Sequence, residues 1–146
     1  MIREDLIRYV VRFPLNQAND YGSVITRQLI DKVNKKLQDG GLFLGELGKP
    51  NMTGLSSEER ARRLSFCDMY NTCNELVRVM IDENKQEACF ILKLTGPKKQ
   101  IATEILKLSN SRFALRAFGS TIYDENQCST NKISISEVIC FDLVSD

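Results

Sequence analysis

The segment Leu42–Pro50 reads LFLGELGKP, and it follows the most regular helical pattern in the chain. Its first three residues are all apolar and predict a short buried strand over residues 42–44. This strand leads directly into Gly45-Glu46-Leu47-Gly48-Lys49-Pro50, after which residues 51–57 are loop-like. The segment therefore marks the point at which a helix gives way to sheet structure.

A change of period before this segment predicts a helix. Within residues 24–39, four apolar residues recur at every fourth position: Ile25, Leu29, Val33 and Leu37. This spacing is typical of an amphipathic helix with one buried face. Ser23 or Thr26 is suited to cap its start, and Gly40-Gly41 would end it.

Strand patterns lie on both sides of this region. Residues 7–13 alternate between apolar and polar side chains, which predicts a strand. Ser56 and Glu59 have the spacing of a capping box, which predicts a short helix over residues 58–66. Two further strands, over residues 76–82 and 87–94, would be joined by a polar turn.

The last third of the chain opens with a helix and continues as strands. Pro97 suits the first turn of that helix, and three residues form its expected apolar stripe: Ile101, Ile105 and Leu108. Strands are predicted over residues 113–118 and within 133–144, with a polar loop at 124–131 between them. Two good helices among strands, without strict βαβ alternation, predict an α+β fold.

The composition is that of one soluble domain spanning residues 1–146. Apolar residues make up 42% and charged residues 27%, a balance that favours a globular domain over a disordered tail. The longest apolar run is far shorter than the roughly 20 residues that a membrane helix needs. We therefore expect no membrane segment.

The chain contains no histidine, which excludes Ser-His-Asp triads, Cys-His proteases and imidazole proton shuttles. Its five cysteines contain no C-x-x-C pair, so we expect reduced thiols, no metal site and no cofactor. Cys73 lies near Arg78 and is the remaining candidate nucleophile, but no base can be named for it. A structural role is favoured for this thiol.

Charge is unevenly distributed along the chain. Residues 93–116 hold six basic residues against one acidic residue, whereas residues 120–146 hold five acidic residues against one lysine. This asymmetry fits either a solvated helix face beside an acidic strand edge, which we favour, or a patch that faces phosphates. The candidate nucleic-acid patch comprises Lys93, Lys98, Lys99, Lys107 and Arg112.

Four motifs, taken in order, carry a resemblance to a known family. Asn19-Asp20-Tyr21 precedes the first helix, and GELGKP follows it. Two strands and a helix lead to Ala114-Leu115-Arg116-Ala117-Phe118-Gly119, and Phe141-Asp142-Leu143-Val144-Ser145 closes the chain. The chain thus resembles the prohead (capsid maturation) proteases of tailed bacteriophages, whose barrel is shared with herpesvirus assemblins. The resemblance implies a mostly antiparallel β-barrel with two main helices packed on it.

Two departures from the family pattern bear on activity. The family has Gly-Glu-Leu-x-His-Pro, and Lys49 stands where that pattern has its catalytic histidine. Ala114 stands where the family has its nucleophilic serine. A protonated lysine cannot take up the proton, and alanine cannot attack a carbonyl. The resemblance therefore implies a catalytically inactive protein that keeps the protease scaffold.

What remains of the family's site predicts binding rather than chemistry. The former substrate groove would be bordered by residues 45–50 and 113–119, and four residues would line it: Glu46, Lys49, Arg116 and Phe118. A phage capsid-related polypeptide would add as a strand beside residues 113–118. Such a protein would act in the host bacterial cytoplasm or in the prohead, and members of the family often self-associate.

Two other hypotheses stay open at this point. The first is a nucleic-acid- or host-factor-binding protein expressed during phage infection, which would use the basic residues between Lys93 and Arg116. The second is an enzyme that uses Lys49 and Glu46 on a small substrate. It is the weakest of the three hypotheses.

Overall fold

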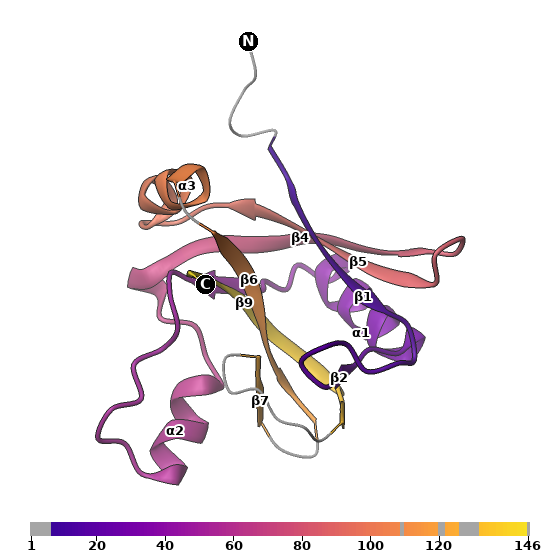
Figure 1. The fold of residues 1–146 in the computed structure, drawn as a ribbon, viewed down its shortest axis with the longest axis horizontal. Helices are drawn as coiled ribbons and strands as arrows, with labels where there is room; N and C mark the ends of the chain where they lie inside the picture. The colour runs from indigo at the N-terminus through magenta and orange to yellow at the C-terminus, as the bar shows by residue number, and fades with distance from the viewer. Residues whose placement is uncertain (1–6, 109, 120–121, 126–131, 146) are drawn as a thin grey trace.

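The computed structural model describes residues 7–108, 110–119, 122–125 and 132–145. Within them, two antiparallel sheets lie side by side (Figure 1). The larger has the order β1-β5-β4-β3, formed by β1 (Tyr9–Pro14), β5 (Glu87–Leu94), β4 (Thr72–Asp82) and β3 (Leu44–Glu46). The smaller has the order β7-β6-β9, formed by β7 (Ile122–Asp124), β6 (Ser111–Phe118) and β9 (Glu137–Ser145).

The two sheets meet where β3 lies against β9. Leu47, just after β3, forms a bridge with Leu143 of β9, so the strands continue from one sheet into the other. The result is a half-barrel in which β1 and β7 are the outer strands. A small parallel pair, β2 (Ser23–Val24) with β8 (Ile133–Ser134), lies outside both sheets.

Three helices accompany the sheets. Helix α1 (Arg27–Gln38) packs against β4 and β9, and α3 (Lys99–Leu108) packs against β4 and β5. Helix α2 (Ser57–Leu64), at the lower left of Figure 1, contacts the smaller sheet at β7. The expected α+β fold of mostly antiparallel strands is confirmed. No helix among the described residues has the length and apolar character needed to cross a membrane.

An aromatic cluster joins the two sheets in the core. The rings of Phe13 and Phe90, on β1 and β5, have centroids 5.5 Å apart, and the Phe90 and Phe141 centroids are 5.2 Å apart. All three side chains are buried. Because Phe141 lies on β9, this contact bridges the larger sheet and the smaller one through apolar packing.

The caps were predicted well. Thr26 Oγ1 accepts the Leu29 N–H at the start of α1, and Ser56 and Glu59 form the expected capping box at α2. Ser23, the other candidate cap, belongs instead to β2. Caps depend on a few adjacent residues, so the local sequence is sufficient to identify them.

Two strand boundaries differ from the prediction. The strand expected over residues 42–44 starts instead at Leu44, and the Leu42 side chain is exposed. Strand β4 begins at Thr72 rather than at residue 76, because its polar first residues pair with β3. Strand β7 was not expected at all, and residues 126–131 of the predicted polar loop lie outside the described residues.

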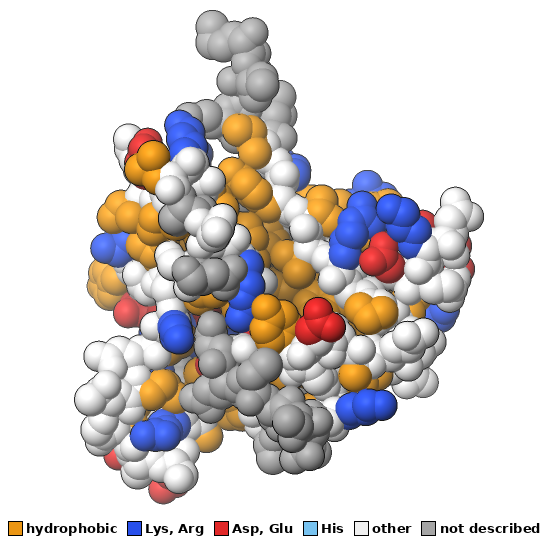
Figure 2. Space-filling view, viewed as in Figure 1, with side chains coloured by type: hydrophobic (Ala, Val, Ile, Leu, Met, Phe, Trp, Pro, Cys, Tyr) orange, Lys and Arg blue, Asp and Glu red, His pale blue; other side chains and the backbone are white. Residues whose placement is uncertain are grey.

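The expected apolar stripe of α3 is correct at one of its three positions. Ile105 packs against the core, whereas Ile101 is 48% exposed and Leu108 is 81% exposed. Figure 2 shows apolar surface at the position of α3. Ala102 is fully buried, and its small side chain lets the helix approach β4 and β5 closely. The helix therefore docks through Ala102 and Ile105, and the apolar side chains at 101 and 108 lie at the surface.

This orientation of α3 predicts opposite effects for two substitutions. Leu108→Lys should change the free energy of unfolding by less than about 0.5 kcal/mol, because the side chain is exposed. Ala102→Leu should destabilise the protein by about 1–3 kcal/mol, because no space exists for a larger side chain. Urea denaturation of both variants measures the difference. A larger loss for Leu108→Lys would contradict this orientation.

Candidate functional site

The GELGKP segment is held tightly against β9. A Cβ atom at Gly45 would lie 1.7 Å from the Phe141 carbonyl oxygen, so only glycine fits there. The Glu46 N–H donates to Asp142 Oδ1 at 3.0 Å, and the Gly48 N–H donates to the Leu143 carbonyl at 2.6 Å. This segment is therefore fixed, residue by residue, along one strand.

Arg116 lies at the centre of a buried charge cluster. Its side chain is fully buried, and all five of its N–H groups have acceptors. Nε donates to Asp142 Oδ2 at 2.7 Å, and Nη2 donates to Asp142 Oδ1 at 3.0 Å and to Glu46 Oε2 at 2.9 Å. Nη1 donates to the carbonyls of Leu64 and Phe66, both at 3.0 Å.

The Glu46 carboxylate forms the second half of this cluster. Arg63 of α2 binds it with two N–H groups, at 2.5 and 2.9 Å. The Asp68 N–H and the Asn71 side-chain amide donate to it as well, at 3.1 and 3.3 Å. Two arginines thus face two carboxylates, Glu46 and Asp142, so the formal charges balance inside the protein.

Burial and hydrogen bonding act in opposite directions on these groups. Burial tends to raise the pKa of Glu46, but bonds from Arg63, the Asp68 N–H and Asn71 outweigh it and hold the pKa below its ordinary value. Burial raises the pKa of Asp142 despite the neighbouring Arg116. The ionised form of Glu46 therefore stabilises the fold, and this contribution is lost as the pH falls through its lowered pKa.

The cluster corrects the predicted roles of Glu46 and Arg116. Both side chains are fully buried, so neither lines a surface groove that a partner contacts. They hold the segment that follows β3 against β6, β9 and the end of α2. We therefore regard them as positioning residues. The hypothesis of a small-molecule enzyme using Lys49 and Glu46 loses its basis, because Glu46 pairs with arginines.

The predicted strand addition beside residues 113–118 is partly blocked. Over Arg116–Phe118, β6 pairs with β7 on one side and with β9 on the other. The Leu115 backbone also bonds to Glu125 in both directions: its carbonyl accepts the Glu125 N–H, and its N–H donates to Glu125 Oε2. Phe118 is half-buried at the end of this paired stretch. No free edge is left there for a peptide strand.

Lys49 lies at the surface and lines an open cleft, here called the Lys49 cleft. The cleft has a volume of about 580 Å³ and is lined by Lys49, Pro50, Asn51, Met52, Thr53, Arg60 and Asp124. Its walls come from the loop after β3, from α2 and from β7. Its position agrees with the predicted groove beside residues 45–50, although the opposite wall is β7 rather than β6.

Ala114 lies two strands away from the segment that carries Lys49. Gly48 bonds to Leu143 of β9, whose register partner on β6 is Phe113, and the next pair is Asp142 with Ala114. The Ala114 side chain is fully buried. Strand β9 therefore lies between β6, which carries Ala114, and the segment that carries Lys49. The correspondence of these two positions to a catalytic pair stays a prediction.

Two of the five residues of the predicted basic patch are neutralised within the chain. Lys93 pairs with Glu75 at 2.9 Å, and Arg112 pairs with Glu125 at 3.0 Å and lies over the ring of Tyr21. Arg116 is buried in its cluster. The acidic C-terminal part thus supplies partners for the basic stretch, which explains the charge asymmetry of the sequence. Three lysines of the patch remain on or next to α3: Lys98, Lys99 and Lys107.

Cys73 does not have the environment of a nucleophile. Its side chain is fully buried on β4, and burial raises its pKa to about 11. At neutral pH the thiol therefore stays protonated. Cys89 and Cys140 are buried too, as expected for structural cysteines, and Cys128 lies outside the described residues.

Sequence reasoning missed Arg63, Asn71 and Asp142 as members of the cluster. A signal for Asp142 was present, because a charged residue stands inside the apolar run of residues 138–144. Arg116 is placed in the same way within residues 113–118. Charged residues in two buried strands indicate that they are paired with each other. No such signal marked Arg63, which lies among other arginines on α2.

Comparison with known proteins places the fold. No protein-family model matches the chain, and no curated protein sequence matches it. Among solved structures, the chain is similar to the bacteriophage T4 capsid assembly protease, gp21, with a TM-score of 0.57 and 16% sequence identity. The match covers 94% of this chain and 81% of that one. The fold is therefore prohead-protease-like, as expected, and at this identity the likeness shows the fold alone.

The buried cluster predicts a large effect for one arginine of the chain. Arg116→Met should destabilise the protein by about 3–5 kcal/mol, because it leaves the buried Asp142 carboxylate without a cation and leaves Glu46 with Arg63 alone. Arg62→Met, on the exposed face of α2, is the matched control and should change stability by less than about 0.5 kcal/mol. Urea denaturation at neutral pH measures both. Equal effects would rule out a structural role for the cluster.

Proposed function

We propose that this chain binds an extended polypeptide in the Lys49 cleft without cutting it. The proposal is supported first by the fold, which is like that of a capsid assembly protease. A protease scaffold presents an elongated cleft to a polypeptide chain. By this likeness the partner would be a phage capsid-related polypeptide, met in the host cytoplasm or in the prohead.

The proposed lack of cleavage rests on the residues at positions 49 and 114. Cleavage of a peptide bond by a serine-type mechanism needs a nucleophilic oxygen and a base that accepts its proton. The Ala114 methyl group supplies no nucleophile, and the chain has no histidine. Lysine at 49 offers N–H donors where the family has an imidazole.

The cleft has the chemistry to hold a polypeptide. Lys49, in the loop after β3, and Arg60 of α2 contribute cationic donors, suited to backbone carbonyls or acidic side chains. Met52 adds a half-buried apolar surface, and Asp124 adds one carboxylate to the lining. The Lys49 wall itself is anchored through Glu46 to the buried cluster. Such a preformed wall loses little conformational freedom on binding, which favours affinity.

Nucleic-acid binding receives less support from the structure. Lys93 and Arg112 are paired with acidic groups of the same chain, which leaves three lysines of the patch near α3. Phosphate binding by so few cations would be weak, because each neutralised phosphate contributes separately to the affinity. We therefore propose no second function from this surface.

Binding at the cleft is tested with an unfolded polypeptide, fluorescein-labelled casein, followed by fluorescence anisotropy. Lys49→Glu should weaken binding about fivefold, because a rim cation becomes a repelling anion. Lys85→Glu, in the exposed turn between β4 and β5, is the matched control and should bind like the unchanged protein. Equal affinities of the two variants for casein would show that the polypeptide does not bind in the Lys49 cleft.

Inactivity is tested on the same labelled casein by following fragments on a gel. The unchanged protein should produce none above the buffer control during prolonged incubation. Fragments that disappear in the Lys49→Ala variant would overturn the proposal of an inactive protein. Fragments that persist in that variant would indicate a contaminating protease, which a second purification removes before the assay is repeated.

A further inference from the structure

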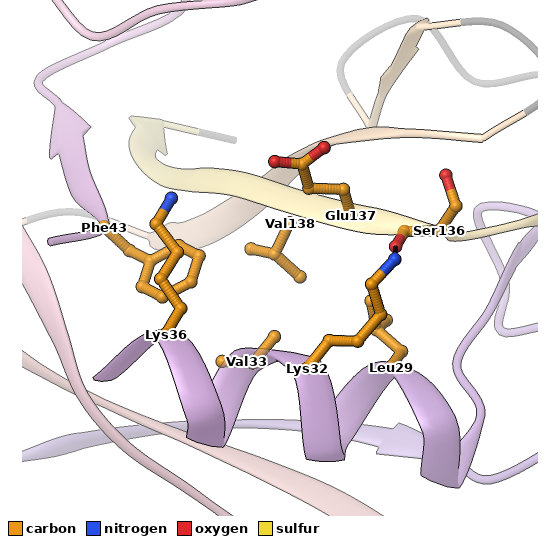
Figure 3. A pocket seen from close by; sticks show the side chains of 8 residues that line it. All are labelled: Leu29, Lys32, Val33, Lys36, Phe43, Ser136, Glu137 and Val138. Carbon is orange, nitrogen blue, oxygen red and sulfur yellow. Dashed lines mark hydrogen bonds between the residues drawn. The ribbon is translucent and has the colours of Figure 1, made fainter. Parts of the chain in front are cut away.

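A second hollow lies on the opposite part of the fold, between α1 and β9 (Figure 3). It has a volume of about 260 Å³ and shares no lining residue with the Lys49 cleft. Four apolar side chains form its walls: Leu29, Val33, Phe43 and Val138. None of them is more than 3% exposed. For scale, an apolar cavity of about 150 Å³ is enough to hold benzene.

Two lysines stand at opposite ends of this α1 hollow. Figure 3 shows Lys36 beside Phe43 and Lys32 beside Ser136, one helical turn apart on α1. The Lys36 ammonium lies 4.4 Å from the centre of the Phe43 ring, and the Lys32 ammonium donates to the Ser136 carbonyl at 2.9 Å. Both partners are uncharged.

The rim of the hollow is therefore cationic. Glu137 is the one acidic residue among those that line the hollow, and its carboxylate points away from α1 in Figure 3. Among the residues that the structure describes, no ion pair joins Lys32 or Lys36 to an acid. Two ammonium groups without an anion flank an apolar space, an arrangement that complements an apolar group with negative charge on both sides.

We propose that the α1 hollow receives one large apolar side chain of a second polypeptide, in a segment where acidic residues flank that side chain. The apolar side chain would enter the space between Val33 and Val138. The flanking carboxylates would meet Lys32 and Lys36 at the two ends. This is a second binding site, and its test does not depend on the Lys49 cleft.

Burial of a Phe or Leu side chain would supply most of the affinity, and the two ion pairs would set the register. Each ammonium would exchange an uncharged partner for a carboxylate, which makes a stronger hydrogen bond. Because the ion pairs are exposed, binding should weaken as salt increases.

The experiment titrates the ¹⁵N-labelled protein with short capped peptides and follows amide chemical shifts. The first peptide carries Glu-Phe-Glu between Gly and Ser residues; the others replace this core by Gln-Phe-Gln or by Glu-Ala-Glu. The Glu-Phe-Glu peptide should shift amides of α1 and β9, and it should bind about tenfold more tightly than either of the others.

Variants of α1 provide the matched comparison. Lys36→Glu should bind the Glu-Phe-Glu peptide about fivefold more weakly than the unchanged protein does. Lys35→Glu makes the same charge reversal in the same last turn of α1, but residue 35 does not line the hollow. The affinity of this variant for the peptide should therefore equal that of the unchanged protein. Circular dichroism confirms that both variants fold. Lys49→Glu should leave this binding intact, which separates the site from the proposed function.

Three outcomes would overturn the proposal. The first is equal binding of the Glu-Phe-Glu and Gln-Phe-Gln peptides, and the second is an equal effect of Lys35→Glu and Lys36→Glu. The third is a set of shifts on α1 and β9 that octanoate produces and the peptides do not. That result would assign the hollow to a small amphipathic acid instead.

Discussion

Arg116 is fully buried on β6 and pairs there with Glu46 and Asp142, which come from two other strands. A guanidinium with no exposed surface is tolerated only when every N–H has an acceptor, and here the acceptors come from β3, β9 and the end of α2. Each of these segments must therefore reach β6 in one register. The close approach of Gly45 to Phe141 and the bridge from Leu47 to Leu143 follow from the same requirement.

The buried residues of the cluster support the fold and do not contact a partner. Glu46 and Arg116 belong to the motifs that resemble the prohead proteases, and they hold the loop that forms one wall of the Lys49 cleft. The shape of the half-barrel therefore rests on these buried residues and not on the side chains at 49 and 114. Under the proposed function, the protein would keep a formed cleft with lysine at 49 and alanine at 114.

The two proposed sites differ in how they recognise a partner. The Lys49 cleft is open and mixed in polarity, with two cationic residues, one acidic residue and two apolar residues in its lining. The α1 hollow is smaller, with apolar walls and a cationic rim. The first suits an extended backbone with little sequence preference, whereas the second suits one particular side chain. Together they would allow a polypeptide partner to be held loosely along its length and specifically at one point.

Local features and the excluded chemistry can be read from the residues alone. Helical period, the Thr26 cap and the Ser56–Glu59 capping box depend on residues a few positions apart, and the lack of histidine is a fact of composition. The apolar strands around Arg116 and Asp142 indicate a buried ion pair, but they do not name Glu46 or Arg63 as further members. Arg116 meets Glu46 across 70 positions, and Leu108 is exposed while Ala102 is buried. These partners and exposures come from contacts between distant segments, so they depend on the folded chain.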